Sequence, residues 1–207
     1  MLEGIIVNMK YLAALLFGLC LLLSPLQAQA KGGTAYVRLE DEITAKTIAP
    51  VREVVQKANQ NEADAIIIDI NSGGGDIDEG FKLIRDIERS KVPVVCIVDG
   101  EADSMASEIF VTCPKRVMTK RSLLMIHQPG YGGNGGQPND LQNSLDYLWH
   151  LQEICIMNYV MHMNVTYDQL QKKIDGGRTW WLDYKEAQAV KAVDIVVDSI
   201  SDILLKN

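Results

Sequence analysis

The segment Ala65-Ile-Ile-Ile-Asp-Ile70 constrains the fold more than any other part of the chain. It is apolar at nearly every position, whereas a strand with one face in water alternates apolar and polar residues. Such a run is typical of a strand buried inside a parallel sheet. A second run, Val94–Val98, follows a predicted helix at residues 76–90, in which apolar residues recur every third position. Strands that alternate with helices in this way predict an α/β fold with a mainly parallel core.

Other segments continue this alternation. Apolar runs predict strands at Ala35–Leu39, Arg116–Met118, Leu123–Ile126 and Ile195–Val197, and a periodic pattern predicts a helix at Thr44–Asn59. The longest predicted helix, Leu141–Met163, is apolar on more than one face. A helix of that kind usually packs on two sides.

The first 30 residues have the three-part pattern of a secretory signal peptide. Met9-Lys10 precedes an uncharged, leucine-rich run, Tyr11–Leu23, and Ala28-Gln29-Ala30 provides a cleavage site between small residues. The apolar run is shorter than the roughly 20 residues that a membrane span requires. We therefore expect residues 1–30 to be removed, residues 31–207 to form one domain, and the protein to be periplasmic or secreted. An uncleaved N-terminal anchor helix is the alternative.

Charge and cysteine content argue against two kinds of partner. The chain has a net charge of −7 and no run of Lys or Arg, so nucleic acid is not expected as a partner. The cysteines after residue 30 are Cys96, Cys113 and Cys155, and their spacing fits no metal site. No metal or other cofactor is expected. Cys96 is predicted to be a buried core residue, and a Cys113–Cys155 disulfide is left open.

Ser104 lies in the stretch Gly100–Ser107, which joins an apolar strand to an apolar, helix-like run. At a strand-to-helix turn a serine can be held exposed, with its Oγ at the positive end of a helix dipole. The position suits a nucleophile, and it equally suits an ordinary helix cap. Whether the rest of the chain supplies a base, an orienting group and an oxyanion hole decides between them.

Two further features follow predicted strands. His127 ends a strand and precedes a loop, where reactive side chains are often presented, whereas His150 and His162 lie within the long helix. Ser72–Gly75 is a glycine turn whose backbone N–H groups can bind an anion. A plain tight turn and a phosphate cradle are the alternatives. The turn lacks the Gly-x-Gly-x-x-Gly spacing and the Walker lysine, which argues against nucleotide binding.

Four motifs in order along the chain resemble those of one enzyme family. Asn71-Ser-Gly-Gly-Gly75 resembles Asn-Ser-Pro-Gly-Gly, Asp103-Ser-Met-Ala106 resembles Ala-Ser-Met-Gly, Met125-Ile-His-Gln-Pro129 matches that family's run at every position, and Asp175-Gly-Gly-Arg178 resembles Asp-x-x-Arg. From about Tyr36 to Ile203 the chain resembles the proteolytic subunit of Clp protease, within the Clp/crotonase superfamily. The resemblance implies an α/β, Clp/crotonase-like fold with repeated β-β-α units and a long handle-like helix, and a homo-oligomer.

The resemblance also implies a role for each site residue. Ser104 would be the nucleophile, His127 the general base and then the general acid, and Asp175 the carboxylate that orients His127. The backbone N–H groups of Gly75 and Met105 would form the oxyanion hole. A Ser/His/Asp serine endopeptidase that cleaves peptides or unfolded proteins through an acyl-enzyme is the implied activity.

Three features depart from the family pattern. Asp103 replaces a small apolar residue beside the nucleophile, where it either caps the helix or, with its side chain turned inward, puts a negative charge near the oxyanion. Gly73 replaces a proline and loosens the turn that positions Gly75. Only residues 31–35 separate the predicted cleavage site from Tyr36, whereas the family usually carries an axial segment there for its unfoldase. Because an exported protein meets no ATP in the periplasm, no ATPase partner is expected.

These observations lead us to expect an exported, ATP-independent serine peptidase. The alternative is a catalytically inactive Clp-like protein that binds peptides or acts as a scaffold. A crotonase-type acyl-CoA enzyme is a third class that also uses paired backbone N–H groups. Export argues against it, because coenzyme A is an unlikely substrate outside the cell.

Overall fold

A computed structural model describes residues 32–130 and 138–201 of the chain. The predicted signal peptide at residues 1–30 lies outside the described residues and stays a prediction. Within the described residues, no helix is both long enough and apolar enough to cross a membrane.

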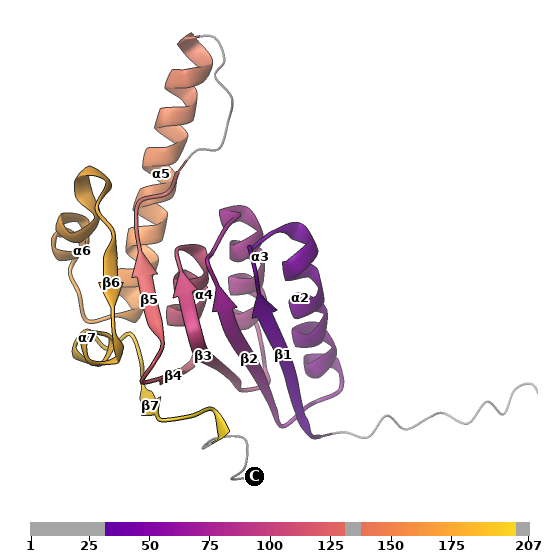
Figure 1. The fold of residues 1–207 in the computed structure, drawn as a ribbon. Helices are drawn as coiled ribbons and strands as arrows, with labels where there is room; N and C mark the ends of the chain where they lie inside the picture. The colour runs from indigo at the N-terminus through magenta and orange to yellow at the C-terminus, as the bar shows by residue number, and fades with distance from the viewer. Residues whose placement is uncertain (1–31, 131–137, 202–207) are drawn as a thin grey trace, which may run out of the picture. The chain divides into compact units, whose positions relative to one another are not determined.

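A seven-stranded sheet lies at the centre of the described fold (Figure 1). Five strands follow one another in space as β1 (Thr34–Glu40), β2 (Ala65–Ser72), β3 (Val94–Asp103), β4 (Lys115–Thr119) and β7 (Ile195–Val197). Every neighbouring pair among these five strands is parallel. The predicted α/β class with a mainly parallel core is therefore confirmed.

Strand β3 pairs with β2 along one edge and with two strands, β4 and β5, along the other. Its first half, Val95–Val98, pairs with β4, whereas Glu101–Asp103 pair in parallel with β5 (Leu123–Ile126). Strand β5 then pairs antiparallel with β6 (Trp180–Leu182). Because β2, β3 and β5 run parallel, their carboxyl ends lie at the same edge, and the segments that follow them meet there.

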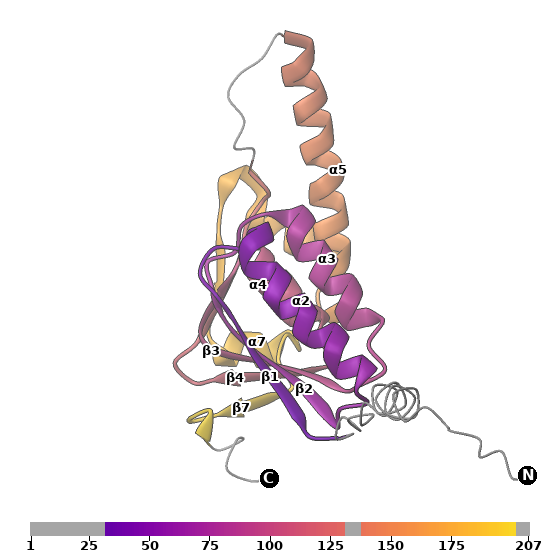
Figure 2. The same ribbon diagram turned by 90° about the vertical axis from the view of Figure 1, so that its right-hand side faces the viewer.

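Helices cover one face of the sheet (Figure 2). They are α2 (Ala45–Gln60), α3 (Ile77–Glu88) and α4 (Met105–Thr112). Beneath them, Ile66, Ile68 and Ile70 of β2 belong to the main hydrophobic core. Ile67 belongs instead to a second, smaller cluster with Ile97 and Val117. Strand β2 is thus buried on both faces, as its composition predicts.

The C-terminal part of the chain contains the longest helix and several short elements. Helix α5 (Pro138–His162) has 25 residues, and its first half extends beyond the sheet in Figure 1. Its second half contacts α4 and buries Ile156 and Tyr159. Helix α6 (Tyr167–Ile174), the short 3-10 helix η1 (Asp175–Gly177), β6 and α7 (Tyr184–Ala189) follow it.

The cysteine pairing differs from the one that the sequence left open. Cys96 and Cys113 form a disulfide, with their Cα atoms 6.0 Å apart, and Cys155 is a buried free thiol. Cys96 is a fully buried residue of the main core, as predicted, whereas the option of a Cys113–Cys155 bridge is wrong. The reason is that α4 packs back along β3, which returns Cys113 to the strand that carries Cys96.

Candidate active site

Ser104 has an unusual backbone conformation at the turn between β3 and α4. Its φ and ψ angles are 54° and −124°, and its side chain makes no capping hydrogen bond. Positive φ is sparsely populated by residues other than glycine, and such conformations concentrate at functional sites. The helix-cap alternative for the Ser104 hydroxyl is therefore not what the structure shows. The Asp103 side chain does not cap the helix either, because Asp103 is the last residue of β3 and Ser104 is the N-cap.

Hydrogen bonds from two other elements hold this turn in place. The Ser104 N–H donates to the carbonyl oxygen of Met125 on β5 over 2.8 Å. The Tyr159 hydroxyl donates to the Ser104 carbonyl over 3.2 Å, and it lies 2.6 Å from Ser107 Oγ. Ser107 Oγ also lies 2.7 Å from the Ser104 carbonyl oxygen. Sequence analysis missed both Ser107 and Tyr159, since Tyr159 is one apolar helix residue among many.

The glycine turn after β2 packs directly against the serine turn. Gly74 has a φ of +86°, and a Cβ built there would lie 2.7 Å from the Ser104 Cβ and 3.1 Å from the Met105 nitrogen. Any side chain at Gly74 would therefore push the two turns apart. The Gly74 carbonyl accepts a hydrogen bond from Ile43 over 2.7 Å, which ties the turn to the segment before α2.

Two backbone N–H groups are available beside Ser104. Met105 is the first residue of α4, so its N–H has no partner within the helix. Gly75 lies in the turn with a φ of +143°. Neither N–H donates a hydrogen bond to another described residue. These are the two donors that sequence analysis proposed for an oxyanion hole.

A cavity of about 480 Å³ opens where the three strands end. Its lining consists of Gly73, Gly75, Asp76, Ile77, Asp78, Ser104, His127, Pro129, Gly130, Tyr147 and Leu151. The structure therefore brings Ser104, His127 and Gly75 to one cavity, as the ends of parallel strands should. Among the described residues no hydrogen bond joins Ser104 Oγ to His127, and catalytic hydrogen bonds are often long before a substrate binds.

Asp175 lies apart from this group. It is exposed at the end of α6. Asp175 lines neither the 480 Å³ cavity nor a second cavity of about 20 Å³, which Ser104 and His127 also line. The antiparallel register pairs Ile126 with Trp180, so one step further along the two strands places Thr179 opposite His127. By this register, Thr179 is the residue opposite His127, and Asp175 lies four residues before Thr179 in the sequence.

Comparison with known sequences places these residues in a family. The family model described as Clp protease matches residues 33–200. The chain belongs to the Clp protease family. It is 33% identical over 141 residues to ATP-dependent Clp protease proteolytic subunit 1 of Chlamydia pneumoniae, covering 67% of this chain and 73% of that protein. The subunits of that name from Chlamydia trachomatis serovar D (30% identical, covering 69% and 75%) and Protochlamydia amoebophila (32%, covering 67% and 68%) are similar. At family level, this membership supports serine peptidase function.

The Clp-like site of this chain has a buried carboxyl group on each side of Ser104. Asp103 is 7% exposed, and its Oδ1 has no hydrogen-bond partner. Burial, with the nearby charge of Glu101, raises the pKa of Asp103 to about 6. Asp103 is absent from the lining of both cavities, so the structure does not show its carboxylate turned toward the proposed oxyanion hole.

Glu108 is the second buried carboxyl group, and sequence analysis did not select it. It lies one helical turn after Ser104 and is 2% exposed. Burial raises the pKa of Glu108 to about 7, although hydrogen bonding with Cys155 and Asn158 lowers it in part. The available signal was a single glutamate within the otherwise uncharged α4 sequence, Met105–Thr112.

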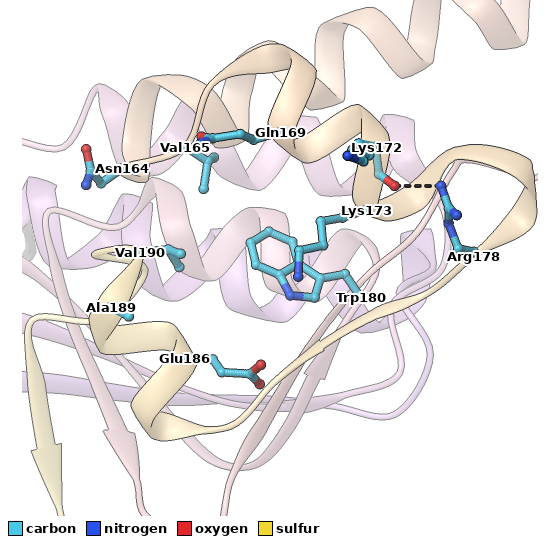
Figure 3. Close-up of a pocket in the computed structure, with 10 residues that line it drawn as sticks. All are labelled: Asn164, Val165, Gln169, Lys172, Lys173, Arg178, Trp180, Glu186, Ala189 and Val190. Atoms are coloured by element: carbon cyan, nitrogen blue, oxygen red, sulfur yellow. Dashed lines mark hydrogen bonds between the residues drawn. The ribbon is translucent and has the colours of Figure 1, made fainter.

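A different cavity lies between α6 and α7 of this Clp protease family member (Figure 3). Its volume is about 700 Å³, and the Trp180 ring faces it with Lys173 Nζ 5.2 Å from the ring centroid. Neither Ser104, His127 nor Asp175 lines it. It is therefore separate from the candidate active site, despite its larger size. Within the described residues, no group of three or more His, Cys, Asp or Glu side chains is placed to hold a metal.

Proposed function

We propose that this chain is an exported serine peptidase that cleaves peptides through an acyl-enzyme and needs no ATPase partner. The observation that carries the proposal is the strained Ser104 turn, which opens into a cavity that His127 and Gly75 also line. A strained serine between a strand and a helix is the geometry of an activated nucleophile. Family membership supports the same chemistry.

The proposed reaction uses Ser104 and His127 in two steps. His127 takes the proton of the Ser104 hydroxyl as Oγ attacks the peptide carbonyl, and it then gives that proton to the leaving amine. An ester on Ser104 remains, and His127 deprotonates the water that hydrolyses it. Gly75 and Met105 donate their backbone N–H groups to the oxyanion in both steps, which is worth about 3–4 kcal/mol per donor.

Asp175 has the role of orienting His127 in this proposal. That role requires the turn after α6 to bring the carboxylate to the imidazole. The turn contains Gly176 and Gly177, both with positive φ (67° and 76°), and a Cβ at either would meet no atom within 4 Å. Glycine lowers the barrier to alternative backbone conformations, which makes such a rearrangement sterically feasible.

Helix α5 is the surface that we propose for homo-oligomer formation. Its exposed apolar residues are Leu145, Tyr147, Trp149, Ile154, Met157 and Met161. Exposed aromatic and methionine side chains in such a group are typical of protein interfaces. Light scattering of the purified chain at micromolar concentration should give a multiple of the monomer mass, and Trp149→Glu should lower it. A monomer in both cases would refute this part of the proposal.

A fluorophosphonate probe tests the nucleophile directly. The purified chain, without any ATPase, should become labelled, and peptide mapping should locate the adduct on Ser104. Ser104→Ala should abolish labelling and His127→Ala should slow it strongly, whereas the matched surface change Ser201→Ala should not affect it. Equal labelling of wild type and Ser104→Ala would exclude the proposed mechanism.

Export has its own test, because it depends on the pattern of residues 1–30. Expression of the full chain in a Gram-negative host should yield periplasmic protein whose first residue is Lys31. Full-length protein in the cytosolic fraction would contradict export without affecting the assignment of the nucleophile.

A catalytically inactive peptide-binding protein is the second candidate. The position of Asp175 outside the cavity lining and the buried carboxyl of Asp103 favour it. This alternative predicts peptide binding with no acyl-enzyme. A burst of product from a peptide ester at neutral pH, absent in His127→Ala, would rule it out.

A further inference from the structure

Glu108 is a buried acid beside the proposed nucleophile. It lies on α4, and its side chain contributes to a second cavity together with Ser104, Met105 and His127. This cavity also includes Ile77, Pro129, Cys155 and Tyr159. Ile77, Ser104, His127 and Pro129 line the 480 Å³ cavity as well, so the two cavities adjoin beside the proposed nucleophile.

One oxygen of Glu108 has no partner. Its Oε1 is buried and makes no hydrogen bond with any described residue. Cys155 and Asn158 are the hydrogen-bonding neighbours of the Glu108 side chain, so the carboxyl group is only partly satisfied. A buried, unpaired acceptor costs roughly 1–3 kcal/mol. Groups of this kind are retained where a ligand or a water completes the hydrogen bonding.

The size of the small cavity limits which group could donate a hydrogen bond to Glu108 Oε1. Its volume is about 20 Å³, and one water molecule needs roughly 10–15 Å³ on the same measure. It therefore holds a group the size of a water molecule, such as an ammonium ion, and not a bulky side chain. An ammonium group is a compact point charge with three donors, whereas a guanidinium group is a wide planar fork.

The charges around the two cavities favour a cation. Asp76 and Asp78 line the larger cavity, and Glu108 lines the smaller one. Among the residues that the structure describes, no Lys or Arg belongs to the lining of either cavity. Of the other groups beside Glu108, Cys155 and Tyr159 have pKa values raised by burial, so they stay neutral near pH 7. His127 is the remaining titratable group among the described residues that line the small cavity.

We infer that the Glu108 cavity is a specificity subsite for lysine, at the substrate residue whose carbonyl carbon Ser104 attacks. The inference rests on the proposed peptidase function and names its substrate class. Glu108 lies four residues after Ser104, or about 6 Å along the helix axis, a distance that the four-carbon stem of lysine can span. The stem passes between Ile77 and Pro129, and the ammonium group donates to the free Glu108 oxygen.

A purely structural Glu108 makes a different prediction, and a pair of substrates separates the two. Peptide esters that differ only in the acylating residue, lysine or norleucine, have side chains of the same length with and without the ammonium group. The subsite predicts that wild type cleaves the lysine ester with a kcat/KM about 10- to 100-fold higher, the range for a hydrogen bond to a charged group. Equal values would overturn the inference without needing any variant.

Glu108→Gln tests the residue itself. The lysine-to-norleucine ratio should fall by about tenfold or more, whereas Glu88→Gln, an exposed glutamate on α3, should leave the ratio unchanged. A fall in kcat/KM for both esters by the same factor would mean that Glu108 serves only the fold. An arginine ester cleaved faster than the lysine ester would contradict the size argument.

Failure of the peptidase proposal can be recognised separately. If wild type gives no fluorophosphonate adduct, binding of the two peptides to the same protein is measured by calorimetry. Tighter binding of the lysine peptide would then support the subsite and reject the peptidase. Equal binding would reject the subsite as well.

Discussion

The edge of the sheet that carries Ser104 and the segment that carries Asp175 are assembled in different ways. Gly75, Ser104 and His127 each follow one of three parallel strands, so the sheet itself brings them to one cavity. Asp175 follows α6, a short helix whose position depends on packing against the rest of the molecule. Strand ends converge because of backbone pairing, whereas a residue on a connecting segment has no such constraint. Asp175 is therefore the member of the proposed triad whose position the sheet does not determine.

The largest expected effect comes from Asp175→Asn. If the carboxylate orients His127, its loss should lower kcat by about 10³- to 10⁴-fold, because the imidazole then adopts the wrong tautomer. Steady-state hydrolysis of a peptide ester measures this. Asp168→Asn, an exposed change on α6, is the matched control and should have no effect.

The same assay can contradict the role of Asp175. If Asp175→Asn stays within about twofold of wild type while Thr179→Val loses activity, the group opposite His127 in the strand register is the orienting residue. Every residue of the site would then lie at the end of a strand, and the segment after α6 would contribute none.

A smaller loss, of about 100-fold in kcat/KM, is expected for Gly74→Ala. The added methyl group would lie 2.7 Å from the Ser104 Cβ, and a displacement of about 1 Å at a catalytic group has an effect of that size. Gly73→Ala, where a Cβ meets nothing within 4 Å, should cause a much smaller change. Comparable losses in the two variants would show that the close packing of the two turns does not matter.

The pH dependence of stability should reveal Glu108, with an effect on the order of 3 kcal/mol. Burial raises its pKa to about 7 from the ordinary 4.5, so the unfolded state releases this proton at lower pH than the folded state. The folded chain therefore loses stability as pH rises from about 4.5 to about 7. Glu108→Gln should remove most of that slope in denaturant unfolding, and an unchanged slope would contradict the raised pKa.

The smallest effect is expected for Tyr159→Phe. Its hydroxyl donates to the Ser104 carbonyl and contacts Ser107 Oγ, so its loss should reduce the free energy of unfolding by about 1 kcal/mol. We expect kcat to fall by about three- to fivefold, because the Ser104 turn becomes less rigid. Thermal unfolding and ester hydrolysis measure the two effects. Tyr147→Phe, on the exposed part of α5, should change the unfolding free energy less. An equal change in both variants would contradict the support role of Tyr159.

Local sequence patterns predicted much of the fold and part of the candidate site. The apolar strand at Ala65–Ile70 predicts the parallel sheet, and Ser104, His127 and the glycine turn at Ser72–Gly75 each follow a predicted strand. These inferences succeed because the period of apolar residues and the direction of parallel strands are properties of short segments.

Only the tertiary structure decided which distant side chains meet. The Cys96–Cys113 disulfide depends on α4 folding back along β3, and the support of Ser104 by Tyr159 joins residues 55 positions apart. Glu108 is one charged residue in a helix sequence, and nothing local indicates that it is buried beside the nucleophile. Segment patterns determine which face of an element is apolar, but the angle and depth of helix packing determine which buried groups share a cavity.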